Sequence, residues 1–240
     1  MAVKASVRKV AAVTGAYSGL GASLSRALLR EGYRLVLGGK DAAQQKAFLR
    51  SVKRDGVIAL VMDVRIKSDC EKFISAAKRS FGRLDLLVNN AGTWRMAPIG
   101  QVTEQDIRDI FETNVFGPIY TSQAAVKIMK KQGSGHILNI GSTAAVEYKT
   151  SHVAYGASKA AIISFTGCLR TELAGTGIRV SVFSPGGMKT GLFRQHPKRM
   201  ESGFMEPDFV AGKIMEHIRS PDDEWHVILK KKGKVKKQME

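Results

Sequence analysis

The chain has 240 residues, of which 44% are hydrophobic and 25% charged, close to the average for globular domains. No segment approaches the roughly 20 apolar residues that a membrane span needs. The first ten residues also lack the features of a secretory signal, so we expect a cytoplasmic protein. The two cysteines, Cys70 and Cys168, predict no disulfide framework. No spacing among the cysteines and the five histidines is typical of a metal site.

The formal net charge is +17, and six of the lysines follow residue 229. We therefore predict one domain over residues 1–229 and a basic tail over residues 230–240. A strongly basic chain favours anionic ligands, such as phosphorylated cofactors, acyl-thioester carriers, nucleic acid or acidic membranes. Charge alone does not choose among them, and a solvated lysine tail is the simplest interpretation.

Short β-branched runs alternate with longer amphipathic stretches along the whole chain. Most of the apolar runs are continuous, as expected for strands covered by helices on both faces. The pattern predicts an α/β fold, a single-domain doubly wound parallel sheet of about seven strands with helices on both faces. The predicted strands are 10–14, 34–37, 57–62, 84–88, 136–140, 179–183 and 225–229. The predicted helices lie near 20–31, 41–54, 68–80, 104–131, 154–174 and 207–219.

A glycine-rich turn, TGAYSGLG at residues 14–21, connects the first strand to the first helix. Glycines allow the backbone to approach a pyrophosphate closely, and the helix N-terminus offers free N–H groups and partial positive charge. The strand before and the helix after strengthen this interpretation over a plain strand–helix turn. The candidate phosphate-binding residues are Gly15, Ser18, Gly19, Leu20 and Gly21.

The second strand ends at Gly38-Gly39-Lys40-Asp41, where an NAD enzyme would carry an acidic side chain for the adenosine ribose. Here glycine replaces the carboxylate, and Lys40 could pair with a 2′-phosphate. We therefore predict NADP(H) in preference to NAD(H). In the alternative interpretation Lys40 faces water and Asp41 caps the next helix.

Tyr155 and Lys159 are four residues apart on one face of a predicted helix. A nearby ammonium favours the phenolate, so this spacing predicts a lowered pKa for Tyr155 and a role as acid and base. Ser142 follows the fifth strand, and Asn114 lies in the preceding long helix. These polar groups fall at the carboxyl edge of the predicted sheet, where a ligand is expected.

Together, these segments resemble the short-chain dehydrogenase/reductase family over essentially the whole chain. The resemblance implies a Rossmann-type oxidoreductase that moves a hydride between NAD(P)(H) and a carbonyl or an alcohol. The segments that carry it are the TGxxxGxG turn, Asp63, the NNAG sequence at 89–92, Asn114, Ser142, the YxxxK pair Tyr155 and Lys159, and Pro185-Gly186 with Thr190.

The resemblance also implies a role for each matching residue. Tyr155 would transfer the proton, Ser142 would orient the substrate oxygen, and Lys159 would act on Tyr155 and bind the nicotinamide ribose. Asn114 would hold a water-linked proton relay. The remaining cofactor contacts would be Asp63, Val64, Asn90, Ala91, Gly92, Pro185, Gly186, Met188 and Thr190.

Simpler roles remain open from the residues alone. Asn114 could serve only as a helix kink and Ser142 as a turn residue, while Asp63 and Thr190 could cap loops.

The chain departs from the family in two places. Ser18 stands where NADP-preferring members often carry a basic residue, which leaves the 2′-phosphate to Lys40. The C-terminus lacks the Gly-Gly ending of many tetrameric members, so a dimer is as compatible as a tetramer with the expected homo-oligomer. Residues 188–205 are the predicted substrate-side loop, and residues 143–152 are expected to form the opposite wall. Trp94 and Met96 are further candidates.

Three functions stay open at this point. The leading hypothesis is reduction of a ketone or aldehyde by NADPH. The second is reduction of 3-oxoacyl thioesters on an acidic carrier protein, received by Lys127, Lys130, Lys131 and Arg170. The third is a non-catalytic NADP-binding regulatory protein, or a nucleic-acid-associated protein that binds through its basic tail.

Overall fold

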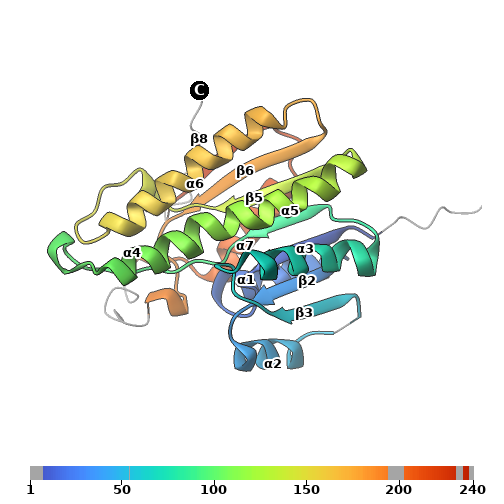
Figure 1. Ribbon diagram of the computed structural model, residues 1–240, viewed down its shortest axis with the longest axis horizontal. Helices are drawn as coiled ribbons and strands as arrows, with labels where there is room; N and C mark the ends of the chain where they lie inside the picture. Colours follow the sequence, from blue (N-terminus) through green and yellow to red (C-terminus); the bar gives the residue numbers. More distant parts are fainter. Residues whose placement is uncertain (1–7, 54, 194–202, 231–234, 238–240) are drawn as a thin grey trace, which may run out of the picture.

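The computed structural model describes residues 8–53, 55–193, 203–230 and 235–237, and these residues form one open sheet between two layers of helices (Figure 1). The strand order is β3-β2-β1-β4-β5-β6-β7-β8. The strands are β1 (Val10–Thr14), β2 (Arg34–Gly39), β3 (Val57–Val61), β4 (Leu86–Asn89), β5 (Gly135–Ile140), β6 (Ile178–Pro185), β7 (His226–Leu229) and β8 (Val235–Lys237). Strands β1 to β7 are parallel, which confirms the predicted doubly wound sheet.

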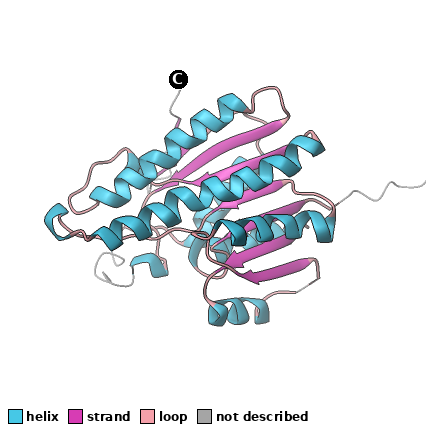
Figure 2. Cartoon of the chain, viewed as in Figure 1, coloured by secondary structure: helices cyan, strands magenta, loops and turns pink. Residues whose placement is uncertain are grey.

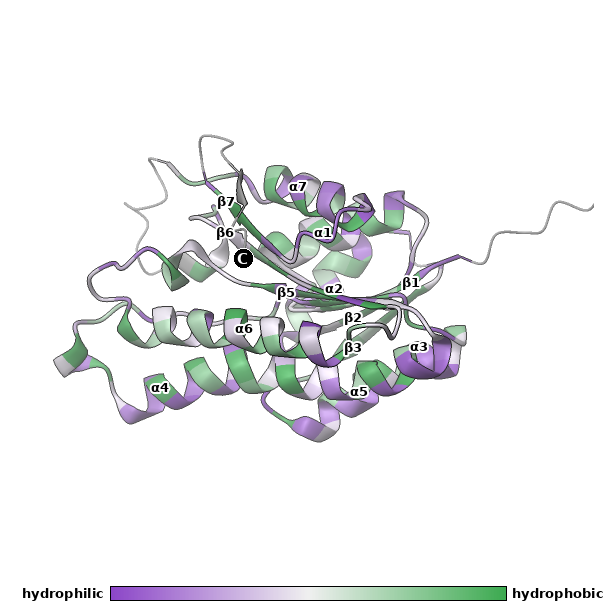
Figure 3. Ribbon diagram, turned by 90° about the horizontal axis from the view of Figure 1, so that it is seen from above, coloured by the Kyte–Doolittle hydropathy of each residue, from purple (hydrophilic) through white to green (hydrophobic). Residues whose placement is uncertain are grey.

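The helices cover both faces of this sheet, as Figure 2 shows. Viewed from above, α3, α4, α5 and α6 lie on one side of the sheet, and α1 and α7 lie on the other (Figure 3). The helices are α1 (Gly19–Arg30), α2 (Ala42–Arg50), α3 (Lys67–Phe81), α4 (Glu104–Phe111), α5 (Gly117–Gln132), α6 (Val153–Glu172) and α7 (Pro207–Arg219).

Each face of the sheet has its own apolar core. Alternate residues of β1 point to opposite faces, so Ala11 and Val13 pack with α1 and α7, while Val10 and Ala12 pack with α3 and α5. All five β1 residues are buried, which explains why the first four form a continuous apolar run in the sequence.

Two elements differ from the sequence-based expectation. Strand β8 forms within the stretch predicted as a basic tail, and it pairs antiparallel with β7 through Val235↔Leu229. Backbone hydrogen bonds make this pairing, and the lysine-rich sequence has no apolar alternation that would predict a strand. The predicted helix 104–131 is interrupted by a π-helical segment, Glu112–Phe116, between α4 and α5.

The strand order places a topological switch point between β1 and β4, because the chain leaves β1 toward β2 on one side and reaches β4 on the other. Parallel sheets of this kind bind ligands beyond the carboxyl ends of the strands at such a point. Within the part of the chain that the structure describes, no helix combines the length and apolarity required to cross a membrane.

Candidate active site

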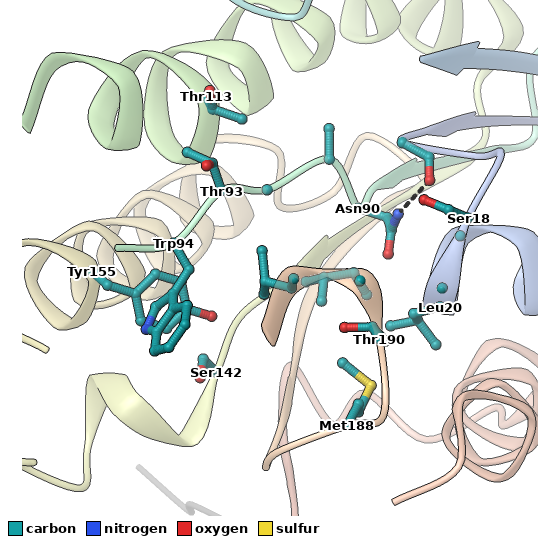
Figure 4. A pocket seen from close by; sticks show the side chains of 18 of the residues that line it. Ser18, Leu20, Asn90, Thr93, Trp94, Thr113, Ser142, Tyr155, Met188 and Thr190 are labelled. Carbon is teal, nitrogen blue, oxygen red and sulfur yellow. Dashed lines mark hydrogen bonds between the residues drawn. The ribbon is translucent and has the colours of Figure 1, made fainter. Parts of the chain in front are cut away.

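A cleft of about 870 Å³ opens beyond the carboxyl ends of the strands at the switch point. All the proposed catalytic and cofactor-binding residues line this cleft except Asn114, which lies just behind it. Of the two further substrate-side candidates, Trp94 lines the cleft and Met96 does not. Figure 4 shows that Tyr155, Ser142 and Trp94 lie at one end of the cleft, while Ser18 and Asn90 lie at the other. Of the predicted substrate-side loop, residues 194–202 lie outside the described residues.

The glycine-rich turn presents its backbone to the cleft because side chains do not fit there. Gly15 has φ +61°, and a Cβ on it would lie 2.9 Å from Ala91 Cα. A Cβ on Gly21 would lie 2.1 Å from Gly15 O. Asn90 fixes the turn from the β4 side, because its Nδ2 donates to Thr14 O at 2.9 Å and to Gly15 O at 3.1 Å. This tight turn before the N-terminus of α1 fits the pyrophosphate of a dinucleotide.

Charged side chains gather where the adenosine half of a dinucleotide would lie. Asp63 accepts hydrogen bonds from the Arg65 guanidinium at 2.9 Å and 2.7 Å to Oδ2 and at 3.1 Å to Oδ1. Arg65 also donates to Asp109 Oδ1 at 2.8 Å. Burial acts to raise the pKa of Asp63, but the hydrogen bonds and charge of Arg65 hold it below its usual value. Lys40 is exposed beside this cluster, and Asp41 accepts from Ala43 N and Gln44 N as the N-cap of α2. Asp41 thus caps α2 as the alternative interpretation expected, and an exposed Lys40 is compatible with either interpretation.

Tyr155 and Lys159 are buried at the opposite end, beside the partly exposed Ser142. The Lys159 Nζ lies 5.9 Å from the centre of the Tyr155 ring and donates to Ile140 O at 2.8 Å. Burial raises the pKa of Tyr155, and a hydrogen bond with the Ser142 hydroxyl opposes this rise. Burial lowers the pKa of Lys159 to about 8. The pKa of Tyr155 therefore departs in the direction opposite to the expected lowering, because burial outweighs the Ser142 hydrogen bond.

Asn114 occupies the π-helical segment and ties two elements together. Its Oδ1 accepts from Thr93 N at 2.8 Å, and its Nδ2 donates to Thr93 O at 2.9 Å and to Ser158 Oγ at 3.0 Å. Thr93 follows β4 and Ser158 lies on α6, so Asn114 fixes the Tyr155 helix against the cleft wall. The sequence allowed either a kink or a relay, and these contacts place Asn114 at a helix irregularity, where active-site residues often lie.

A chain of buried polar side chains supports the site from within the sheet. Asn89 Nδ2 donates to Asn139 Oδ1 at 2.9 Å, and Asn139 Nδ2 donates to Thr166 Oγ1 at 2.9 Å. Thr121 Oγ1 completes the network by donating to Asn89 Oδ1 at 2.6 Å. The network joins β4, β5, α5 and α6, and each member is hydrogen-bonded, as buried polar groups must be.

Sequence reasoning missed several residues of the cleft. Tyr17 lies in the glycine-rich turn, and its hydroxyl donates to Leu37 O at 2.8 Å, which ties the turn to β2. Burial raises the pKa of Tyr17 to about 12. Arg65, which was also not expected, lines the adenosine end. Lys149 and Phe204 line the catalytic end, and both fall in the predicted substrate-side segments 143–152 and 188–205. Arg65 stands two residues after Asp63, and this short spacing is the sequence feature that could have identified it.

The carrier-docking lysines of the second hypothesis lie away from the cleft. Lys130 and Lys131 are in the last turn of α5, whose final residue, Gln132, donates to Leu84 O near the start of β4. That end of α5 is at the edge of the sheet opposite the cleft, about 24 Å from the start of the helix. Arg170 is paired with Asp223.

Comparisons with known proteins agree with this geometry. The family model described as short chain dehydrogenase matches residues 9–201. An uncharacterised oxidoreductase of Staphylococcus aureus (strain USA300) is 32% identical over 213 residues, covering 89% of this chain and 92% of that protein. A short chain dehydrogenase/reductase of Burkholderia phymatum, solved with NAD, has a TM-score of 0.87 at 26% identity, covering 92% of this chain and 88% of that one. A 3-ketoacyl-(acyl-carrier-protein) reductase of Brucella melitensis, solved with NADH, has a TM-score of 0.83 at 28% identity, with 90% and 93% covered.

The chain therefore belongs to the short-chain dehydrogenase family. It is an NAD(P)-dependent oxidoreductase with a Rossmann-type fold. In the described part of the chain, no group of three or more His, Cys, Asp or Glu side chains is placed to hold a metal ion.

Proposed function

We propose that the protein reduces a ketone or aldehyde with NADPH, using Tyr155 as the proton donor. The observation that carries this proposal is that the buried Tyr155 and Lys159 lie beside Ser142 at one end of the dinucleotide cleft. A purely regulatory nucleotide-binding protein needs the glycine-rich turn but has no use for a buried phenol and lysine at the other end. The nucleic-acid alternative rests on tail residues of which 231–234 and 238–240 lie outside the described part of the chain.

Each of these side chains has a defined task. The nicotinamide cofactor, when bound, supplies the hydride. The Tyr155 hydroxyl donates its proton to the carbonyl oxygen, and a pKa raised by burial keeps that proton in place at neutral pH. The Ser142 hydroxyl hydrogen-bonds the same oxygen and orients it. The Lys159 ammonium stabilises the phenolate left behind, and Asn114 holds the helix that carries both groups.

The preference for NADP(H) rests on Lys40. It is exposed, it lines the adenosine end of the cleft, and Gly39 beside it carries no carboxylate to repel a 2′-phosphate. Lys40→Ala should weaken NADPH binding by about tenfold, the value of one charge-assisted hydrogen bond, and leave NADH binding unchanged. Equal losses for the two cofactors, measured by fluorescence titration, would show that Lys40 does not bind the phosphate.

Reduction of 3-oxoacyl thioesters is the second candidate, favoured by the likeness to the Brucella melitensis enzyme. It requires an acidic carrier to dock near the cleft, whereas Lys130 and Lys131 lie at the opposite edge of the sheet. A KM for carrier-linked substrates that rises steeply with salt, beside a salt-independent KM for the free thioester, would favour this candidate.

The proposal also includes a homo-oligomer. Ile107 and Phe116, on the α4–α5 layer, are 42% and 44% exposed, and a second copy of the chain could cover them. Light scattering during size-exclusion chromatography gives the mass directly, and a monomer at assay concentrations would contradict the expectation.

The decisive experiment is NADPH oxidation against a panel of ketones and aldehydes, with Tyr155→Phe in parallel. We expect turnover by the wild type and a loss of at least 100-fold in kcat for Tyr155→Phe, with cofactor affinity retained. Lys130→Gln is the control, because this exposed lysine is far from the cleft. Equal turnover by wild type and Tyr155→Phe would refute the role of the phenol.

A further inference from the structure

The two ends of the cleft differ in charge. Three carboxylates line it among the described residues, and they are Asp41, Asp63 and Asp109. All three belong to the adenosine end, where Asp63 and Asp109 are paired with Arg65 and Asp41 caps α2. At the catalytic end, the lining residues in the described part of the chain include Lys149 and Lys159 but no carboxylate.

Lys149 keeps a positive charge in excess of its local partner. Its Nζ is 3.4 Å from Glu147 Oε2, while Glu147 Oε1 accepts a short hydrogen bond from Lys230. The hydrogen bond from Lys230 holds the pKa of Glu147 below its usual value, so this carboxylate is ionised at neutral pH. One negative charge thus stands between two ammonium groups, and the cluster has a net charge of +1.

The position of Lys149 suits a ligand that is already bound at Tyr155. Lys149 belongs to the segment between Ser142 and the start of α6, and both ends of that segment line the catalytic end of the cleft. Its side chain is half-exposed, so its ammonium can turn from Glu147 toward the cleft without leaving water. Lys159, in contrast, is buried and committed to Ile140 O.

Aromatic and apolar side chains line the remaining surface of the catalytic end. Trp94 packs against His152 with ring centres 5.7 Å apart, and Phe204 and Leu192 also line the cleft. Figure 4 shows Trp94 beside Ser142 and Tyr155 at this end. The His152 Nδ1 is 2.8 Å from Thr150 O, which accepts but cannot donate, so this nitrogen carries a hydrogen and is not available to the ligand.

We propose that the substrate is an oxo acid, a ketone or aldehyde that carries a carboxylate, and that Lys149 binds this carboxylate. The carbonyl oxygen lies at Tyr155 and Ser142, and the carbon chain between the two groups lies against Trp94. In the reaction, the carbonyl carbon gains a hydride from the cofactor and the oxygen gains the Tyr155 proton, while the carboxylate is unchanged. This inference rests on the proposed carbonyl reduction and specifies its substrate class.

The test compares each acid with its own methyl ester. Linear oxo acids with two, three or four methylenes between the carbonyl and the carboxylate are assayed with NADPH beside the corresponding esters. The wild type should prefer the best acid over its ester by at least about tenfold in kcat/KM, as expected for one charge-assisted hydrogen bond. Added salt should raise KM for the acid and leave KM for the ester unchanged.

Matched variants assign the preference to one side chain. Lys149→Gln should remove the advantage of the acid and leave the kcat/KM of the ester unchanged. Glu147→Gln should act in the opposite direction and lower KM for the acid, because it frees Lys149 and removes a negative charge. Lys130→Gln should behave as the wild type. Equal losses for acid and ester in Lys149→Gln would overturn the proposal.

A binding measurement separates this inference from the proposed function. Calorimetry on the protein–NADP⁺ complex compares pentanoate with methyl pentanoate, neither of which has a ketone or aldehyde carbonyl to reduce. Tighter binding of pentanoate by the wild type than by Lys149→Gln would support the carboxylate site, whether or not any carbonyl compound is turned over. Absence of turnover on every carbonyl compound would refute only the proposed reductase activity. Reduction of the oxo acids and their methyl esters at equal rates, together with equal affinity for pentanoate and methyl pentanoate, would refute the carboxylate site. The proposed reductase activity would not be affected by that result.

Discussion

Two buried histidines predict that the protein loses stability as the pH falls below about 6.5. His136 and His217 lie near the starts of the strands, at the edge of the sheet opposite the cleft, and both contact the Ser181 hydroxyl, at 2.7 Å and 3.0 Å. Burial, together with the charge of Arg179, lowers the pKa of His217 from 6.5 to about 4. Burial also lowers the pKa of His136, well below 6.5. Both rings are therefore neutral in the folded protein at pH 7.

The size of the effect follows from the pKa of His217. A histidine whose pKa is lower in the folded than in the unfolded state makes its full contribution to the free energy of unfolding above the unfolded-state pKa of 6.5. This contribution is lost as the pH falls toward the folded-state pKa of about 4. At pH 5 the unfolded chain is protonated at this position and the folded chain is mostly neutral, so His217 alone costs about 2 kcal/mol. For a chain of this length, that loss lowers Tm by about 4–8 °C, and His136 adds to it with the same sign.

Urea denaturation at pH 8, 6.5, 5.5 and 5 measures this loss directly. His217→Gln removes one titrating ring and keeps a side chain that can hydrogen-bond Ser181, so its free energy of unfolding should change less between pH 8 and pH 5 than that of the wild type. The relevant quantity is the difference in pH dependence, because the substitution can shift stability at every pH. An identical loss in wild type and variant would refute the assignment to His217.

Three substitutions test other contacts of the cleft. Gly21→Ala places a Cβ 2.1 Å from Gly15 O, so the turn must move, and cofactor affinity measured by fluorescence titration should fall at least tenfold. Asn114→Ala leaves the backbone groups of Thr93 without their partners and should cost about 1–3 kcal/mol in urea denaturation. Tyr17→Phe removes the hydrogen bond to Leu37 O and should cost about 1 kcal/mol by the same measurement, with little change in kcat.

Most of the fold could be predicted from the sequence, because neighbouring residues in the chain determine most of its strands, turns and helices. Residues 10–13 form an unbroken apolar run because both faces of β1 are covered, and this pattern identifies a central strand directly. The glycine-rich turn was equally readable, since no other residue type fits at Gly15 or Gly21. Boundaries shifted by one or two residues where a strand continued into polar positions, as at the end of β6, which extends to Pro185.

The features that the sequence did not reveal depend on distant partners. Arg65 meets Asp109 across 44 positions in the chain, and Lys149 shares Glu147 with Lys230, which arrives from the end of β7. No periodicity connects such residues, because the sheet order brings them together. The prediction of a lowered pKa for Tyr155 failed for the same reason. Spacing on a helix predicts that Lys159 is a neighbour, but it does not predict how deeply the pair is buried.

The two edges of the sheet give the protein two separate pH limits. At the edge opposite the cleft, the stability that the neutral His217 provides begins to fall below pH 6.5, where the unfolded chain takes up a proton at this position. At the cleft, Lys159 loses its proton as the pH rises through about 8. In the proposed mechanism, loss of that ammonium removes the charge that stabilises the Tyr155 phenolate, so kcat should fall above pH 8 within seconds and recover on return to pH 7. Activity lost at pH 5 should instead grow with incubation time and follow unfolding, and His217→Gln should slow that loss without moving the alkaline limit. If His217→Gln moved both limits together, the two edges would be coupled and the separation argued from their positions would be wrong.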